Sequence, residues 1–359
     1  MMNKKEVSVV LRGHYWIGLL GAVFIYALTQ PWGLGELRES VVYLEAAKHF
    51  ALGQGFQVYG LGATLVPMPL PAGYSFVLSW SWFLGLDVLA WARILQAAFF
   101  GGNIILLSAA TFELTQQKKL AFIAGSLLFF FWPLLQAHLI ASPVPLVLLF
   151  SLSALICFLR YQKTDGKIFF YMGLSLAVLT LGLHWAGVFI VLIFCIMWLM
   201  HQGRLEFLKG FLRNVNGRLL GTSKTKFCKV LLAAFLLFCL MNALALSYTV
   251  FVKGLGYHAS AWMRSKAIKE LKSLDDGVDV YTDDVVAAYA LMGRPAVALG
   301  VLFAPSDKEE LRKNFESRQA LVVLFDQQVQ EKMRLYLLKE LSLAKVIGDE
   351  KASIFVYQK

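Results

Sequence analysis

Charged residues are scarce in this chain of 359 residues. Asp, Glu, Lys and Arg make up 16% of it, compared with about 25% in an ordinary globular domain. Hydrophobic residues make up 58% and aromatic residues 14%, and the mean hydropathy is +0.63. A soluble protein of this length would have to expose much of that apolar surface to water. The composition therefore predicts a polytopic membrane protein, with the lipid bilayer as one of its partners.

Several motifs of catalysis and cofactor binding are also missing. The chain has no Walker motif, no His-Glu-x-x-His and no nucleophile elbow. Gly53-x-Gly55 and Gly101-Gly102 do not follow predicted strands, so they are not predicted to bind phosphate. The four cysteines show no metal-binding spacing, and none lies in the polar C-terminal segment. Neither a zinc site nor a disulfide framework is predicted.

The net charge of +11 is carried by short segments between hydrophobic runs. This distribution is typical of cytoplasmic loops in membrane proteins, where Lys and Arg are enriched. A nucleic-acid footprint would instead gather the positive charge on one face of a domain. The charge therefore predicts no nucleic-acid partner.

About seven transmembrane helices are expected, because about 20 apolar residues in a helix cross the hydrocarbon core. The first apolar run resembles a signal peptide, but no small-residue cleavage site follows, so it is interpreted as an anchor. Residues 71–86 are apolar but short and rich in Trp, which favours a helix lying in the membrane interface. The predicted spans are 14–31, 88–112, 119–135, 143–160, 167–183, 185–201 and 229–251.

Positive charge predicts the orientation of these spans. If 71–86 does not cross, most Lys and Arg residues of the membrane module fall in segments on one side, which is then the cytoplasmic side. This places the N-terminus in the cytoplasm and the C-terminal domain in the periplasm or outside the cell. The predicted inside positives are Lys4, Lys5, Arg12, Lys118, Lys119, Arg160, Lys163, Lys167, Arg204, Lys209, Arg213, Arg218, Lys224, Lys226 and Lys229.

The chain is predicted to divide into a transmembrane module, residues 1–255, and an extracytoplasmic domain, residues 256–359. The first outer loop, about 32–87, belongs to the module in this division. Within it, residues 36–52 alternate apolar and charged residues at helical spacing, and Gly53 and Gly55 follow as a stop signal. Glu39 and Tyr43 stand four residues apart, so they are expected on one face of this helix.

The C-terminal segment alternates short β-branched runs with amphipathic ones, which predicts a small α/β domain of roughly four strands without a catalytic centre. Asp283-Asp284 resembles a metal-binding pair but is better explained as a helix N-cap. Ser306 with Glu309 predicts a further helix start. The expected strands are 278–281, 320–325 and 352–357, and the expected helices lie near 284–292 and 329–343.

Four segments together resemble the GT-C superfamily of membrane glycosyltransferases, which includes protein mannosyltransferases and aminoarabinose transferases. Glu39-Ser-Val-Val-Tyr-Leu through Gly53-Gln-Gly55 is similar to the acidic first-loop motif of the family. Pro69-Leu-Pro-Ala-Gly-Tyr74, followed by Leu84-Gly85, resembles its second interfacial helix. Trp91-Ala-Arg-Ile94 resembles the opening of its next span, and 280–295 resembles its outer α/β domain.

The resemblance implies transfer of a sugar from a polyprenyl-phosphate carrier to a glycan, lipid or protein acceptor at the outer face of the cytoplasmic membrane. Such a transfer needs a carboxylate that deprotonates the acceptor hydroxyl, and the family motif assigns this role to Glu39. The alternative for Glu39 is a solvated residue on an amphipathic helix. Carrier or acceptor contacts are expected from Arg38, Tyr43, Tyr74, Arg93, His138, Ser142 and His184.

The chain departs from the family pattern at two places. Ser142-Pro143 stands where relatives usually have an acidic residue, and a hydroxyl neither holds a metal tightly nor acts as a base at neutral pH. His184-Trp185 stands where relatives tend to have Arg. No organic cofactor is implied, and a divalent cation is left open. The rival hypothesis is therefore a catalytically inactive GT-C-like binding or assembly protein of the cell envelope.

Two further alternatives concern the role of the two histidines and the possibility of a transporter. His138 and His184 can equally serve as hydrogen-bonding residues inside a helix bundle. A transporter is disfavoured, because no predicted span carries the buried charge expected of a coupling site.

Overall fold

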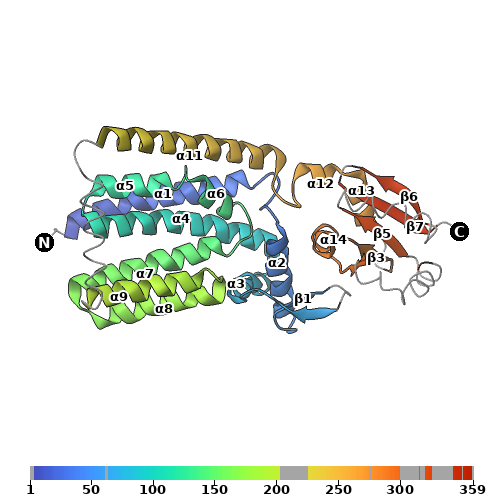
Figure 1. Cartoon of the computed structure of the whole chain (residues 1–359), viewed down its shortest axis with the longest axis horizontal. Coiled ribbons are helices and arrows are strands. Elements are labelled where there is room, and N and C mark those ends of the chain that lie inside the picture. The colour runs from blue at the N-terminus through green and yellow to red at the C-terminus, as the bar shows by residue number, and fades with distance from the viewer. Residues whose placement is uncertain are drawn as a thin grey trace. The chain divides into compact units, whose positions relative to one another are not determined.

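The computed structural model describes residues 4–60, 64–202, 225–274, 277–299, 315, 320–325, 343–349 and 351–357 (Figure 1). The chain forms two compact units. The helical unit comprises Met1–Gln30, Leu70–Tyr74 and Ala90–Phe251, and the mixed unit comprises Pro31–Pro69, Ser75–Leu89 and Val252–Lys359. The predicted division at residue 255 grouped the first outer loop with the helices. In the structure, most of that loop packs with the C-terminal segment.

Six of the seven predicted apolar ranges each hold a single helix, and the range 119–135 holds two. Among the described residues, α4 and α7 are long and apolar enough to cross a membrane, and α5 with α6 adds a third span if this bent pair counts as one. The predicted count of seven spans is therefore not confirmed. The helices are α1 (Lys4–Leu28), α4 (Val88–Thr115), α5 (Lys118–Leu127), α6 (Trp132–His138), α7 (Val144–Thr164), α8 (Lys167–Leu183), α9 (Gly187–His201) and α11 (Thr225–Lys253).

The predicted span 119–135 is not one continuous helix. Helix α5 ends at Leu127, α6 begins at Trp132, and the two are bent by 62°. Pro133 occupies the first turn of α6, where its missing N–H costs nothing. In the interior of a continuous helix the same proline would lose a hydrogen bond and clash with the preceding turn. The proline therefore accounts for the break that the apolar composition did not predict.

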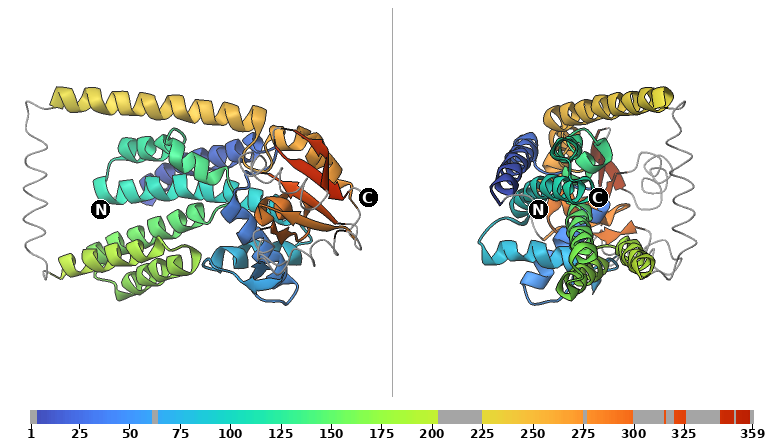
Figure 2. Two further views of the ribbon diagram at one scale, coloured as in Figure 1. Left: turned by 45° about the vertical axis from the view of Figure 1, so that its right-hand side comes forward. Right: turned by 90° about the vertical axis from the view of Figure 1, so that its left-hand side faces the viewer.

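Helices α7, α8 and α9 pack side by side, as both views in Figure 2 show. Their shared core contains Ala154 and Phe158 from α7, Ala177 from α8 and Phe194 from α9. The Phe158 and Phe194 rings meet edge to face at 5.4 Å between centroids. Small and aromatic side chains thus alternate across the interface, which lets the three helices approach closely.

Residues 32–87, predicted to be the first outer loop, fold into two helices and a hairpin. These are α2 (Arg38–Ala51), the antiparallel strands β1 (Gln57–Tyr59) and β2 (Leu65–Pro67), and α3 (Gly73–Phe83). The helix predicted at 36–52 is confirmed, and Gly53 and Gly55 follow it at φ +77° and +79°, values that favour glycine. The hairpin was not predicted.

Helix α3 has 11 residues, so it is about 16 Å long and shorter than the ~30 Å hydrocarbon core. Trp80, Trp82 and Phe83 on it are exposed. A short helix with exposed aromatic residues agrees with the interfacial position expected for 71–86, which stays a prediction.

The C-terminal segment forms one mixed sheet of five strands among the described residues, in the order β4-β3-β5-β7-β6. Strand β3 is parallel to β4 and β5, whereas β7 is antiparallel to β5 and β6. The helices and strands of the C-terminal segment are α12 (Ser260–Arg264), α13 (Lys266–Lys272), β3 (Asp279–Thr282), α14 (Val285–Met292), β4 (Val297–Ala298), β5 (Ala320–Leu324), β6 (Leu343–Gly348) and β7 (Ser353–Tyr357).

Both faces of the central strand are buried. Leu321 and Val323 of β5 pack with Ile268 of α13 and Leu291 of α14, while Val322 on the opposite face is also buried. This explains why the Ala-Leu-Val-Val-Leu run is apolar throughout rather than alternating. The α/β character predicted for the segment is confirmed, with five described strands where roughly four were expected, three of them at given positions.

Strands β4 and β6 of this sheet were not predicted, and some predicted features lie outside the described residues. Strand β4 has only two residues, and β6 begins at Leu343, where a helix was expected to end. The rest of the helix predicted near 329–343, and the helix start at Ser306 with Glu309, lie outside the described residues, as do the predicted inside positives between residues 203 and 224.

Candidate functional site

The first turn of α2 carries the residue predicted as the base. Glu39 and its neighbour Arg38 are exposed, and Glu39 lies in the first helical turn, where a negative charge complements the helix dipole. The Ser40 hydroxyl accepts a hydrogen bond from the Leu37 amide at 3.2 Å, which helps to fix the start of the helix. The Glu39 carboxylate is therefore accessible from solvent.

Tyr43 lies one turn further along α2 and points into the core, with 1% of its surface exposed. Burial, followed by the negative charge of Glu39, raises the pKa of Tyr43 to about 12. The two residues were expected on one face of the helix, and the charge of Glu39 does act on the Tyr43 hydroxyl, but Glu39 is exposed whereas Tyr43 is buried. Tyr43 itself is buried in packing rather than presented to a ligand.

Arg38 lies on the wall of a polar cavity of about 470 Å³. Tyr257 and Asp284 line the same cavity, and the positive charge of Arg38 acts on the Tyr257 hydroxyl. Of the residues predicted to contact substrate in the mixed unit, Arg38 is the one that borders a cavity large enough for a small ligand.

Glu45 was not singled out in the sequence, yet it is the buried carboxylate of α2. One carboxyl oxygen accepts the Tyr59 amide at 2.5 Å, and the His49 ring nitrogen Nε2 lies 3.9 Å away. Burial raises the pKa of Glu45 to about 7, although the Tyr59 hydrogen bond and the charge of Lys48 act in the opposite direction. This carboxyl can therefore hold or release a proton near neutral pH.

Glu36 is a second buried carboxylate in the mixed unit. Its Oε1 lies 2.9 Å from Nε2 of His258, and its carbonyl oxygen accepts the Tyr257 amide at 3.0 Å. Gly256 has φ +59° and packs against the Glu36 backbone so closely that a Cβ atom would clash there. These contacts join the start of the first outer loop to the segment that follows α11.

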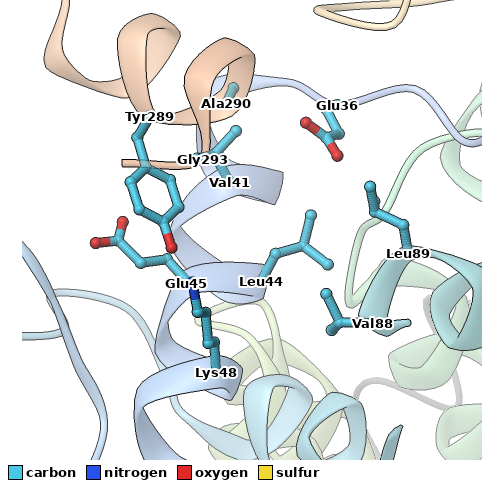
Figure 3. A pocket seen from close by; sticks show the side chains of 10 residues that line it. All are labelled: Glu36, Val41, Leu44, Glu45, Lys48, Val88, Leu89, Tyr289, Ala290 and Gly293. Carbon is cyan, nitrogen blue, oxygen red and sulfur yellow. The ribbon is translucent and has the colours of Figure 1, made fainter. Parts of the chain in front are cut away.

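Glu36 and Glu45 border one small cavity of about 190 Å³ (Figure 3). Figure 3 shows Glu45 beside the Tyr289 ring, with Glu36 apart from them at the upper right of the view. The remaining wall is largely aliphatic, and the volume is below the roughly 300 Å³ at which small-molecule pockets begin. This cavity is therefore a weaker candidate for a substrate site than the polar cavity at Arg38.

The predicted site residues of the helical unit are engaged in internal hydrogen bonds. Nε2 of Gln96 donates to the Tyr74 hydroxyl at 2.9 Å and to the carbonyl oxygen of Ser142 at 2.7 Å. The Ser142 hydroxyl accepts the Val144 amide at 3.3 Å, at the start of α7. The structure thus brings Tyr74 and Ser142 together through Gln96, which the sequence analysis did not single out.

His138 is fully buried and is held by two bonds. Its Nε2 pairs with Nδ2 of Asn103 at 3.1 Å, and its Nδ1 pairs with the Leu134 carbonyl oxygen at 2.6 Å. Because the amide nitrogen can only donate and the carbonyl can only accept, the proton belongs on Nδ1. Asn103 also donates to the Pro145 carbonyl oxygen at 3.0 Å.

Arg93 and His184 also have partners close by in the helical unit. The Arg93 guanidinium lies 4.5 Å from the centre of the Tyr26 ring and donates to its hydroxyl at 3.0 Å. His184 ends α8, and its Nδ1 accepts the Ala186 amide at 3.1 Å. Both residues therefore have structural roles, whether or not they also contact a substrate.

The spacing of the polar residues that were not predicted could have indicated them in the sequence. Gln96 and Asn103 are two polar residues seven positions apart in an apolar run, so they lie on one face of α4 and suggest a hydrogen-bonded interface inside a bundle. Glu45 and His49 are four apart and likewise share a face. Within the described part of the chain, no three His, Cys, Asp or Glu side chains are grouped to hold a metal ion.

Comparison of the chain with protein-family models, with curated proteins and with solved structures finds no match.

Proposed function

We propose that this chain is a membrane glycosyltransferase that transfers a sugar from a polyprenyl-phosphate carrier to an acceptor outside the cytoplasm. The observation that carries the proposal is the exposed Glu39 carboxylate in the first turn of α2, next in the chain to Arg38, which lines a polar cavity. The apolar helices and the aromatic surface of α3 suit a protein that works on a lipid-anchored donor.

In this mechanism Glu39 takes the proton from an acceptor hydroxyl as its oxygen attacks the anomeric carbon of the sugar. The new glycosidic bond forms while the bond between that carbon and the carrier phosphate oxygen breaks. The polyprenyl phosphate leaves with the bonding electron pair. Arg38 precedes the base in the chain and offers N–H donors to the acceptor.

The replacement Glu39→Gln tests the proposal. It preserves shape but removes the base, so the rate of transfer should fall about 10²–10⁴-fold, the usual contribution of general base catalysis. The protein level should hardly change, because the side chain is exposed. The measurement is mass spectrometry of the cell-envelope glycans and glycolipids in strains that carry the variant, the wild type or a deletion.

Glu270→Gln is the matched control, because Glu270 is another exposed glutamate on a helix of the mixed unit. This variant should give the wild-type envelope profile. A wild-type profile from Glu39→Gln, with a clear defect in the deletion strain, would contradict the catalytic assignment.

A non-enzymatic binding or assembly protein is the second candidate. The specific observation in its favour is that Ser142 replaces the acidic residue of the resembled family and has its carbonyl and hydroxyl oxygens engaged by Gln96 and Val144. A scaffold requires the mixed unit to be intact but not the Glu39 carboxylate. The Glu39→Gln strain therefore separates the two candidates.

A further inference from the structure

We propose that the polar cavity bordered by Arg38 binds a saccharide, which is the acceptor of the transfer reaction; as an acceptor site it rests on the function proposed above. The cavity has a volume of about 470 Å³, within the range of roughly 300–1,000 Å³ that is usual for small-ligand sites. The lining residues used below are Arg38, Tyr257, Trp262, Asp283, Asp284 and Phe325.

One part of the wall is aromatic. The Trp262 ring lies 5.9 Å from the Tyr257 ring and 6.0 Å from the Phe325 ring, measured between centroids. All three side chains are only partly buried, so apolar ring surface faces the cavity. Aromatic surfaces of this kind pack against the apolar C–H faces of a pyranose ring, while the sugar hydroxyls point outward to polar partners.

The polar part of the wall supplies both acceptors and donors. Oδ1 of Asp284 accepts the Val286 and Ala287 amides as the N-cap of α14, which fixes the side chain and leaves Oδ2 to accept from a ligand hydroxyl. Oδ1 of Asp283 accepts the Phe325 amide at 2.8 Å. These bonds hold both carboxylates in place before a ligand arrives, which reduces the entropy lost on binding.

Tyr257 and Arg38 supply hydrogen-bond donors. Burial, followed by the charge of Asp284, raises the pKa of Tyr257 to about 12, so its hydroxyl keeps its proton at neutral pH. The Arg38 guanidinium offers several N–H groups in one plane. A ligand with neighbouring hydroxyl groups can therefore both donate to the aspartates and accept from Tyr257 and Arg38.

The charges in the wall disfavour other ligand classes. Charges of both signs lie close together there, so neither a bare anion nor a bare cation meets a wall of uniformly opposite charge. With a guanidinium and two carboxylates beside aromatic rings, and the Lys351 ammonium 5.4 Å from the centre of the Trp262 ring, a neutral polyhydroxylated ligand satisfies the wall best. Arg38 precedes Glu39 in the first turn of α2, so the cavity borders the helical turn that carries the proposed base.

The experiment uses the full-length protein in lipid nanodiscs, labelled with a fluorophore and applied to an array of neutral mono- and oligosaccharides. We expect binding to a subset of the array, weakened at least tenfold by Arg38→Gln and by Asp284→Asn. Asparagine is also a good N-cap, so the second variant keeps α14 intact while it removes the charge. Circular dichroism of each variant confirms that it is folded.

Arg264→Gln is the matched control, because Arg264 is another exposed arginine of the mixed unit and does not line the cavity. It should bind like the wild type. An array without any bound saccharide, or equal binding by Arg38→Gln, Asp284→Asn and wild type, would overturn the proposal.

Binding is measured without any carrier, so it is independent of the transfer chemistry. Saccharide binding combined with a wild-type envelope profile from Glu39→Gln would keep the cavity as a saccharide site and reject the transferase. A transfer defect in Glu39→Gln without saccharide binding would keep the transferase and reject the cavity as a saccharide site.

Discussion

At the scale of single residues, α2 carries carboxylates in two contrasting environments. Glu39 is exposed in its first turn, whereas Glu45, nearly two turns later, is 5% exposed. Glu45 faces Lys48 and His49 of its own helix, the Tyr59 amide of β1 and the Tyr289 ring of α14. The resemblance to the first-loop motif points to Glu39, whereas Glu45 is the carboxyl whose pKa is raised by burial.

The raised pKa of Glu45 predicts that the protein loses stability as the pH rises. Its folded-state pKa is about 7, above the ordinary value of 4.5. Between these values the folded state holds a proton that the unfolded state has released, so the free energy of unfolding falls with increasing pH. Above pH 7 the carboxylate is ionised in both states, and the fold has lost on the order of 3 kcal/mol from this group.

Glu45→Gln tests this effect. Glutamine can still accept the Tyr59 amide but cannot ionise, so the variant should be more stable than wild type at pH 8. Its free energy of unfolding should also change less between pH 5 and pH 8. Denaturant unfolding followed by tryptophan fluorescence measures both. Parallel pH profiles for the two proteins would show that Glu45 does not titrate as described.

At the scale of elements, α1 and α4 meet at two glycines. A Cβ atom at Gly101 would lie 2.5 Å from the carbonyl oxygen of Gly18, and one at Gly18 would lie 2.8 Å from that of Gly101. Without side chains at these positions, the two helix backbones come into direct contact. Small residues have the same role at many helix interfaces in membranes.

Gly101→Ala should therefore destabilise the helical unit by about 1–3 kcal/mol, the usual cost of overpacking. Gly13→Ala on α1 is the control, because a Cβ atom there meets nothing within 4 Å. Unfolding of both variants in mixed micelles, followed by circular dichroism, provides the comparison. Equal stability of the two variants would argue against close packing of α1 on α4.

The elements also show where local sequence is informative. Long apolar runs predicted the helices because hydrophobicity along a helix is a local property. The β1–β2 hairpin and strand β4 were missed because they are only two or three residues long per strand. The break between α5 and α6 was missed because its apolar composition outweighed the signal of Pro133.

At the scale of the whole molecule, the orientation in the membrane stays a prediction from the positive charges. In a variant without native cysteines, Lys118→Cys should resist an impermeant maleimide in intact cells and react after permeabilisation. Lys269→Cys, on the exposed side of α13, should react in intact cells. Labelling of Lys118→Cys from outside would reverse the predicted orientation.

The sequence by itself determined the membrane-like composition, the positions of the apolar helices, helix α2 and the α/β character of the C-terminal segment. These features follow from composition and periodicity within short windows. Asp284 as the N-cap of α14 was also predictable, because a cap bonds amides two and three residues ahead.

Only the tertiary structure decided which polar groups meet. Glu45 reaches the amide of Tyr59, Gln96 joins Tyr74 to Ser142, and Asp283 holds the Phe325 amide 42 residues away. Helical periodicity shows which face of an element is apolar, but not which distant segment will cover it. The pKa of Glu45 and the cavity beside Arg38 depend on such long-range packing, so neither could be derived from local sequence.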